Sequence, residues 1–174
     1  YLICSFHRGI LNDAHTTESE SNRSKLIAKS AEAMGFEVVD SSYGVDKVNF
    51  YKKCDLHIGY RVHGHLYFLS QRKPSFLIHE DGRGRGTSEA LGLSGVQGWN
   101  RTKLGRAATR FKSKRFPALL EKLKLDLIPR NEATEELEHL LERSFADKFA
   151  NFQEVANTMR RQYPTMTKFI ESIP

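Results

Sequence analysis

The sequence predicts an α/β fold, a Rossmann-like parallel sheet flanked by helices and followed by a helical C-terminal part. Short apolar runs alternate with segments of helical spacing over residues 1–100, which is the pattern of β-α-β units. These runs are apolar at successive positions, as expected for parallel strands that are buried on both faces. The chain has 174 residues, of which 39% are apolar, and this is enough for the core of one domain.

The first predicted elements are a strand, a helix and a second strand. Residues 1–6 form an apolar strand, and Thr17 and Glu20 have the spacing of a capping box. In a capping box the two residues satisfy each other's backbone amides at the start of a helix. The helix ends at Gly35, and residues 36–40 form the next strand. The helix is predicted to pack through an apolar stripe of Leu26, Ile27, Ala31 and Met34.

The alternation continues through the next sixty residues. The predicted elements are a short helix over 45–54, a strand over 55–60, a helix from Val62, a strand over 75–78, a helical turn over 89–91 and a last short strand over 95–97. Pro74 opens the strand over 75–78, which is nearly all apolar and is therefore predicted to be the central one.

Only helical spacing is found after Phe116. Its apolar positions are Leu137, Leu140, Leu141, Phe145, Phe149, Phe152, Val155 and Met159, and Pro164 is predicted to break this pattern. We interpret residues 1–174 as a single domain with a core over 1–100 and a helical part over 101–174. Because Tyr1 lies inside an apolar run, we expect the chain to be the carboxyl-terminal half of a two-domain protein.

Cysteine content and hydropathy bear on the compartment. Cys4 and Cys54 are too few for a disulfide framework or a metal cage. Both lie in apolar runs, so we expect free buried thiols in a reducing compartment, the cytoplasm. No run reaches the ~18 apolar residues of a membrane span. Any membrane contact is therefore expected to be peripheral.

The net charge of +6 and the pI of about 9.4 favour anionic partners. Much of this charge is local, because residues 100–116 contain no acid. The seven cations there are Arg101, Lys103, Arg106, Arg110, Lys112, Lys114 and Arg115. This segment is either a solvated helix face or a surface for anionic lipid or a polyanionic polymer. Aromatic residues do not alternate with the cations, so nucleic acid is not an expected partner.

Cationic residues follow several predicted strands at the point where each strand ends. In a parallel sheet these ends meet at one edge, where ligands gather. We predict an anion site of Arg61, His63 and the amides near Gly64 at the start of the helix from Val62. Its other predicted members are His7, Arg8, Gly59, Asp81 and Arg83. An arginine grips phosphate or carboxylate by a forked pair, and a histidine of near-neutral pKa can move a proton. The alternative is a packed turn.

The remaining histidines and the glycine-rich run have their own interpretations. His65 lies about 200° around the helix from His63, so the two are not expected to bind a metal jointly, and no metal site is predicted. His57 alternates with apolar neighbours and is interpreted as a packed sheet histidine. The sequence GRGRG over 82–86 is either a phosphate loop or a flexible glycine-rich turn.

The run "FYKKCDLHIGYRVHGHLYFLSQRKPSFLIHEDGRGRGTSEALGL" over residues 50–93 resembles the carboxyl-terminal half of polysaccharide pyruvyl transferases. The shared parts are an Asp-aliphatic strand with Gly59, then Arg61-Val62-His63-Gly64, a strand after Pro74, and a final Leu-Gly-Leu over 91–93. The resemblance covers about a quarter of the chain. It departs from the family in the loop over 80–83, where the family has a shorter pattern of an acid followed by lysine.

The resemblance implies a half-domain of GT-B type and the transfer of a pyruvyl group from phosphoenolpyruvate to a sugar of a polysaccharide as a ketal, in cell-envelope and exopolysaccharide biosynthesis. It places Arg61 and His63 in the donor site, with His63 as the acid/base, and it implies no cofactor besides the donor substrate. Two alternatives stay open. One is a GT-B-like glycosyltransferase half with a nucleotide-sugar donor, and the other is a non-catalytic module that binds anions or glycans.

Overall fold

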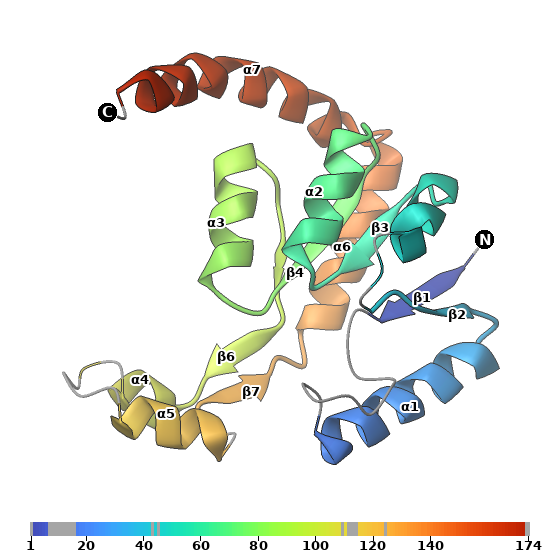
Figure 1. Ribbon diagram of the computed structural model, residues 1–174, viewed down its shortest axis with the longest axis vertical. Coiled ribbons are helices and arrows are strands. Elements are labelled where there is room, and N and C mark those ends of the chain that lie inside the picture. The colour runs from blue at the N-terminus through green and yellow to red at the C-terminus, as the bar shows by residue number, and fades with distance from the viewer. Residues whose placement is uncertain are drawn as a thin grey trace. The chain divides into compact units, whose positions relative to one another are not determined.

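The computed structural model describes residues 2–6, 17–42, 44, 46–108, 110, 115–123 and 125–172. The fold is mixed α/β, with parallel sheets flanked by helices (Figure 1). This confirms the predicted class. The chain forms two compact units, Tyr1–Asp55 and Leu56–Pro174. The strands of the described residues pair in three sheets, of two, three and two strands.

The first unit is a β-α-β arrangement. Strands β1 (Ile3–Phe6) and β2 (Glu37–Asp40) pair in parallel, and α1 (Glu18–Ala33) connects them. The capping box is confirmed, because the Thr17 hydroxyl accepts from the Glu20 amide while the Glu20 carboxylate accepts from the Thr17 amide at 3.0 Å. A 3-10 helix, η1 (Asp46–Lys53), ends the unit.

The predicted apolar stripe of α1 is wrong in part. Ala31 is buried as expected, together with Ala28 and Ser21. The large members of the stripe, Leu26, Ile27 and Met34, are 67%, 49% and 68% exposed. Small side chains therefore form the packed face of α1, because they let the helix approach the sheet closely.

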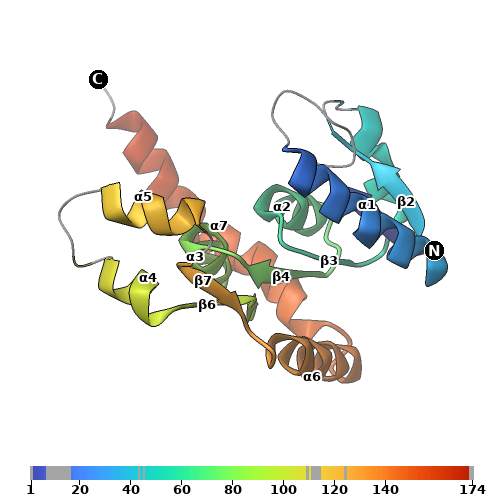
Figure 2. The same ribbon diagram turned by 90° about the horizontal axis from the view of Figure 1, so that it is seen from below.

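The second unit is built on a parallel sheet of order β3-β4-β5. Its strands are β3 (His57–Gly59), β4 (Ser75–His79) and β5 (Val96–Gln97), with α2 (Val62–Ser70) and α3 (Gly82–Leu91) as the connecting helices. The prediction that β4 is central is confirmed. Helices α2 and α3 lie on one side of the sheet and α6 (Ala133–Ala146) lies on the other (Figure 2).

The alternation of side chains along β4 creates two different faces. Phe76, which is 1% exposed, contacts the rings of Phe149 and Phe152 on the α6–α7 side. Ser75 and His79 point to the opposite side, toward α2 and α3, where each hydrogen bonds a side chain of the covering helix. One strand thus carries an apolar core on one face and buried polar groups on the other.

The glycine-rich run over 82–86 is neither a phosphate loop nor a flexible turn. It forms the first turns of α3, which begins at Gly82 after the N-cap residue Asp81. Gly84 is buried, and a Cβ atom there would lie 3.3 Å from the His79 ring. This glycine is therefore explained by the close approach of α3 to β4.

The region after Phe116 is not purely helical. Strand β7 (Leu127–Pro129) pairs antiparallel with β6 (Trp99–Arg101), and the short helices α4 (Lys103–Ala108) and α5 (Arg115–Lys122) lie between them in the chain. Antiparallel pairing was not predicted, because β7 has three residues and no alternating pattern.

The C-terminal helices differ from the predicted continuous pattern. Helix α6 is followed by a corner at Lys148 and Phe149, both with positive φ, and then by α7 (Ala150–Glu171). Burial of the Phe149 ring against Phe76 offsets the backbone cost of this corner. Pro164 does not end the helix but lies inside α7, which curves along its length (Figure 1). Such bending is usual where a proline removes a backbone hydrogen bond.

The cysteines and the hydropathy of the helices can be compared with the sequence predictions. Cys4 and Cys54 are free and half-buried thiols, and burial raises the pKa of Cys4. Within the described part of the chain, no helix has both the length and the apolar character that crossing a bilayer requires.

We predict opposite effects for two helical glycines. At Gly105 in α4, a Cβ atom would collide with the backbone of Asp126, whose carbonyl carbon would be 3.1 Å away. Gly105→Ala should therefore lower the free energy of unfolding by about 1–3 kcal/mol. Gly86 in α3 meets nothing within 4 Å. Gly86→Ala should raise it by about 0.5–1 kcal/mol.

Urea denaturation of both variants provides the measurement, and Gly86→Ala is the matched control for introducing an alanine into a helix. If Gly105→Ala is as stable as Gly86→Ala, the close approach of α4 to the residues before β7 is wrong.

Candidate functional site

Two helices of the second unit begin directly after neighbouring strands. Helix α2 follows β3, and α3 follows β4. Because β3 and β4 are parallel, both helix N-termini lie beyond the same edge of the sheet. Free backbone amides and the positive end of the helix dipole attract anions at such places. The two helix starts differ, however, in what their side chains do.

The start of α3 is closed by its own side chains. The Asp81 carboxylate accepts from the Arg83 amide at 2.9 Å and from the Gly84 amide at 3.4 Å. Its other oxygen accepts from Arg83 Nε at 2.8 Å and Nη2 at 2.6 Å. The Arg83 guanidinium and these amides hold the pKa of Asp81 below its usual range. Asp81 and Arg83, both predicted to bind substrate, thus bind each other.

The start of α2 has no such closure. Arg61 occupies the N-cap position in an extended conformation, and its side chain makes no capping hydrogen bond. Arg61 and His63 are exposed, whereas Gly64 is buried. The Arg61 and His63 side chains are therefore both presented to solvent at the start of α2. Their exposure argues against the packed-turn alternative, in which both side chains would be buried and bonded internally.

Gly59 has a packing explanation. A Cβ atom at this position would lie 2.9 Å from Nε2 of His57. Glycine here leaves room for the His57 ring, which packs against Phe68 of α2 with a centroid distance of 5.1 Å. The interpretation of His57 as a packed sheet histidine is therefore confirmed, and Gly59 shapes the site without itself offering a side chain to a ligand.

A hydrogen-bonded row of buried side chains lies beneath α2. The hydroxyl of Ser75 is 2.8 Å from Nδ1 of His57 and 2.8 Å from Nδ1 of His65. His65 is 1% exposed, and its Nε2 has no hydrogen-bond partner among the described residues. A buried N–H without a partner is rarer than a buried acceptor without one. We therefore assign the His65 proton to Nδ1, donated to Ser75, whose hydroxyl in turn donates to His57.

A second polar pair lies beneath α3. His79 Nε2 is 2.9 Å from the Ser88 hydroxyl, and both side chains are buried. A Cβ atom at Gly95 would lie 2.9 Å from the Leu77 carbonyl oxygen and would overlap the His79 ring. Burial lowers the pKa of His79, and burial together with the nearby His79 lowers the pKa of His65 to about 4. Both histidines are neutral at physiological pH.

The sequence predicts that His63 and His65 face different ways, and this is confirmed. It does not predict that His65 and Ser75 are bonded to each other. The sequence feature that could have indicated this hydrogen bond is Ser75, a single hydroxyl at the start of a strand that is otherwise nearly all apolar. A hydroxyl buried there requires a hydrogen-bond partner from a covering element.

A small pocket at the same edge of the sheet was also not predicted. It has a volume of about 160 Å³, and its walls include Tyr60 after β3, Ile78 of β4, Trp99 of β6 and Arg130. Arg130 is tethered, because its guanidinium pairs with the carboxylate of Glu136 and donates to the Gln97 carbonyl at 3.3 Å. The pocket joins two aromatic side chains that are far apart in the sequence. Sequence patterns within one element cannot reveal this.

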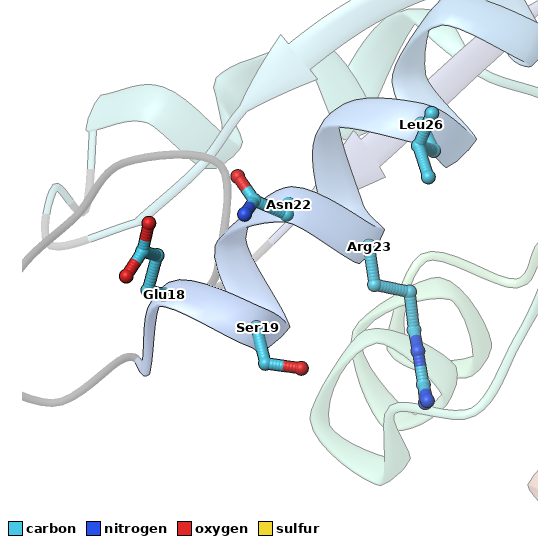
Figure 3. A pocket seen from close by; sticks show the side chains of 5 residues that line it. All are labelled: Glu18, Ser19, Asn22, Arg23 and Leu26. Atoms are coloured by element: carbon cyan, nitrogen blue, oxygen red, sulfur yellow. The ribbon is translucent and has the colours of Figure 1, made fainter.

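A second depression, on the surface of α1, has no convergent polar groups. Figure 3 shows Glu18, Asn22 and Arg23 on an exposed stretch of α1, in a depression that Ser19 and Leu26 also line. These side chains come from successive turns of one helix and do not converge on one point. They therefore do not form a convergent binding site.

The last two predicted site residues precede α1 in the sequence. His7 and Arg8 lie outside the described residues. Among the residues that are described, no cluster of three or more His, Cys, Asp or Glu side chains has an arrangement that could hold a metal ion.

Comparison of the chain with models of protein families, with curated proteins and with solved structures finds no match.

We predict that His65 makes the stability of the protein depend on pH. Its pKa is about 4 in the folded chain against 6.5 as the ordinary value, so the unfolded chain binds the proton first as the pH falls. The free energy of unfolding should decrease by up to about 3 kcal/mol between pH 6.5 and pH 4 from this group. Above and below this window His65 should contribute no slope.

The measurement is urea denaturation at a series of pH values. His65→Asn keeps a donor near Ser75 but cannot titrate, so it should flatten the dependence; the remaining slope of the same sign belongs partly to His79. His63→Asn, two residues away and exposed, is the control and should leave the slope unchanged. An equal slope in wild type and His65→Asn would contradict the assignment.

Proposed function

We propose that the chain is part of a transferase of the polysaccharide pyruvyl transferase type. It moves a pyruvyl group from phosphoenolpyruvate to a sugar of a polysaccharide or glycan as a ketal. The observation that carries the proposal is the start of α2, where the N-cap residue makes no capping hydrogen bond and Arg61 and His63 are exposed. This is the segment in which the sequence resembles that family.

The donor suits this arrangement. Phosphoenolpyruvate carries both a phosphate and a carboxylate, so its binding requires more than one cationic or amide group. Arg61 can hold one of these groups by a forked pair of charge-assisted hydrogen bonds. The first-turn amides of α2 and the helix dipole can stabilise the other. The charge that develops on the departing phosphate is stabilised by the same groups.

We assign the proton transfers of the reaction to His63. In the reaction, the methylene carbon of phosphoenolpyruvate gains a proton and becomes a methyl group. One sugar hydroxyl adds to C2, and a second hydroxyl replaces the phosphate there. Both hydroxyls lose their protons, and inorganic phosphate leaves. His63 donates the proton to carbon and accepts one from a hydroxyl, as an exposed imidazole next to the donor can do.

The finer fold assignment belongs to the same proposal. We assign the chain as a half-domain of GT-B type, in which the edge of the β3-β4-β5 sheet faces a cleft that a second half completes. The parallel order of these strands and the helices on both sides of the sheet support this assignment. The cytoplasm is the compartment in which phosphoenolpyruvate and the free thiols of Cys4 and Cys54 are both expected.

A second candidate function is a GT-B-like glycosyltransferase half that uses a nucleotide-sugar donor. The observation that favours it is the pocket walled by Tyr60 and Trp99. Aromatic side chains at the edge of a sheet can stack on a base or on a sugar ring. The diphosphate would use the same Arg61 and α2 amides. The two candidates therefore differ in whether the pocket is occupied by the donor.

We predict different kinetic effects of two substitutions in the intact enzyme. His63→Ala should lower kcat by about 10²-fold or more and change donor affinity less, because it removes a proton-transfer group. Arg61→Lys should weaken donor binding and turnover together by about tenfold or more, since lysine lacks the planar fork. Arg143→Lys, an exposed change on α6, is the control. The measurement is phosphate release from phosphoenolpyruvate in the presence of acceptor glycan.

The proposal fails if phosphoenolpyruvate at millimolar concentration does not bind near Arg61 in soaked crystals and if Arg61→Lys has the kinetics of Arg143→Lys. Binding without turnover in the intact protein would instead support a non-catalytic anion-binding module.

We predict that Trp99 reports which donor is bound. It is the only tryptophan of the chain, so intrinsic tryptophan fluorescence comes from the pocket alone. A nucleoside diphosphate sugar that occupies the pocket should quench this fluorescence, whereas phosphoenolpyruvate at the α2 start should leave it nearly unchanged. Saturable quenching that Tyr60→Leu weakens would favour the glycosyltransferase over the pyruvyl transferase.

A further inference from the structure

The positive charge of the chain is concentrated at one end of the second unit. Residues 98–128 contain nine Lys and Arg and only two Asp and Glu, a net charge of +7, whereas the whole chain carries +6. This segment contains β6, α4 and α5 and extends into β7. We call residues 99–129 the β6–β7 end. The other residues together are close to neutral, so the excess charge is local.

The described cations of the β6–β7 end are at the surface. They are Arg101, Lys103, Arg106, Arg110 and Arg115, and all five are exposed. The exposure of these five side chains agrees with both interpretations of the segment, the solvated helix face and the anion-binding surface. The structure does not describe the side chains of the other four cations, Lys112, Lys114, Lys122 and Lys124.

Large apolar side chains are exposed in the same elements. Leu104 of α4 is 52% exposed, Leu119 of α5 is 51% exposed and Ile128 of β7 is 51% exposed. Leu123 and Leu125, which follow α5, are exposed to 55% and 47%. Leu120 of α5 is buried, with 4% exposure. The exposed leucines are thus not needed for the internal packing of this end.

The β6–β7 end is held together by backbone and side-chain hydrogen bonds. The Thr102 amide donates to the Asp126 carbonyl at 2.9 Å, and its hydroxyl donates to the Leu125 carbonyl at 2.7 Å. The same hydroxyl accepts from the Gly105 amide at 2.9 Å. Thr102 therefore links the start of α4 to the residues that precede β7.

We propose that the β6–β7 end docks on the surface of an anionic phospholipid bilayer. A bilayer interface accepts both kinds of side chain, since lipid phosphates attract the cations while the boundary of the acyl chains takes up the leucines. A soluble polyanion would complement the charge but would leave the leucines in water. The docking does not depend on the proposed transferase activity, and it would place a glycan-modifying site beside the membrane.

The test uses flotation of the full chain with vesicles, without any donor substrate. The chain should bind vesicles of phosphatidylcholine that contain phosphatidylglycerol and should not bind vesicles of phosphatidylcholine alone. Raising the ionic strength from about 0.1 M to about 1 M shortens the screening length from about 10 Å to about 3 Å. Binding should weaken strongly over this range.

The cations are tested by the triple variant Arg101→Gln, Lys103→Gln, Arg110→Gln. Its binding should be about 100-fold weaker, since each cation near an anionic surface contributes about fivefold. The matched control removes three exposed cations from α7, with Arg160→Gln, Arg161→Gln and Lys168→Gln. It changes the net charge equally but should retain nearly all of the binding. An equal loss in both triple variants overturns the proposal.

The apolar contribution is tested by Leu119→Ser with Leu123→Ser, which leaves the charge unchanged and should weaken binding by about tenfold. Met159→Ser with Tyr163→Ser, exposed in α7, is its control. If the leucine variant binds like wild type while the charge variant does not, the surface serves a soluble polyanion and the lipid proposal is wrong. Circular dichroism and titration with phosphoenolpyruvate verify the fold and the donor site of each variant separately.

Discussion

Strand β4 is covered on both faces, and the packing of the second unit depends on this constraint. Ser75, Phe76 and Leu77 are each 1% exposed. Because successive side chains of a strand point to opposite sides, one face of β4 packs against the aromatic side chains at the α6–α7 corner and the other packs against α2 and α3. A substitution on either face therefore acts on a different half of the unit.

The polar face of β4 constrains the candidate site from below. Ser75 links His57 of β3 to His65 of α2, and His79 is bonded to Ser88 of α3. Buried polar groups without partners are costly, so these bonds favour one position of each helix on the sheet. Arg61 and His63 lie four and two residues before His65 in the sequence. The burial of His65 against Ser75 thus helps to fix the part of α2 on which Arg61 and His63 are exposed.

Topology alone does not decide which of the two helix starts is suited to an anion. Both α2 and α3 begin at the carboxyl edge of the same parallel sheet. At α3 the Asp81 carboxylate already accepts from the first-turn amides and from Arg83, so an anion would have to displace it. At α2 the N-cap residue is a cation that makes no capping bond. The N-cap side chains, Asp81 at α3 and Arg61 at α2, therefore decide which helix start can accept an anion.

The sequence by itself determined the features that depend on neighbours within a few residues. These include the α/β class, the capping box of Thr17 and Glu20, the central position of strand 75–79, the start of a helix at Val62 and the opposite directions of His63 and His65. Only the tertiary structure decided that Ser75 joins two histidines, that Trp99 and Tyr60 line one pocket, and that β7 pairs with β6. The buried face of α1, with Ala28 and Ala31 inside and Leu26 outside, also belongs to this second group. The physical reason is that periodicity records which side of an element is apolar, whereas such pairings depend on how close the elements approach and on which polar groups must find partners once water is excluded.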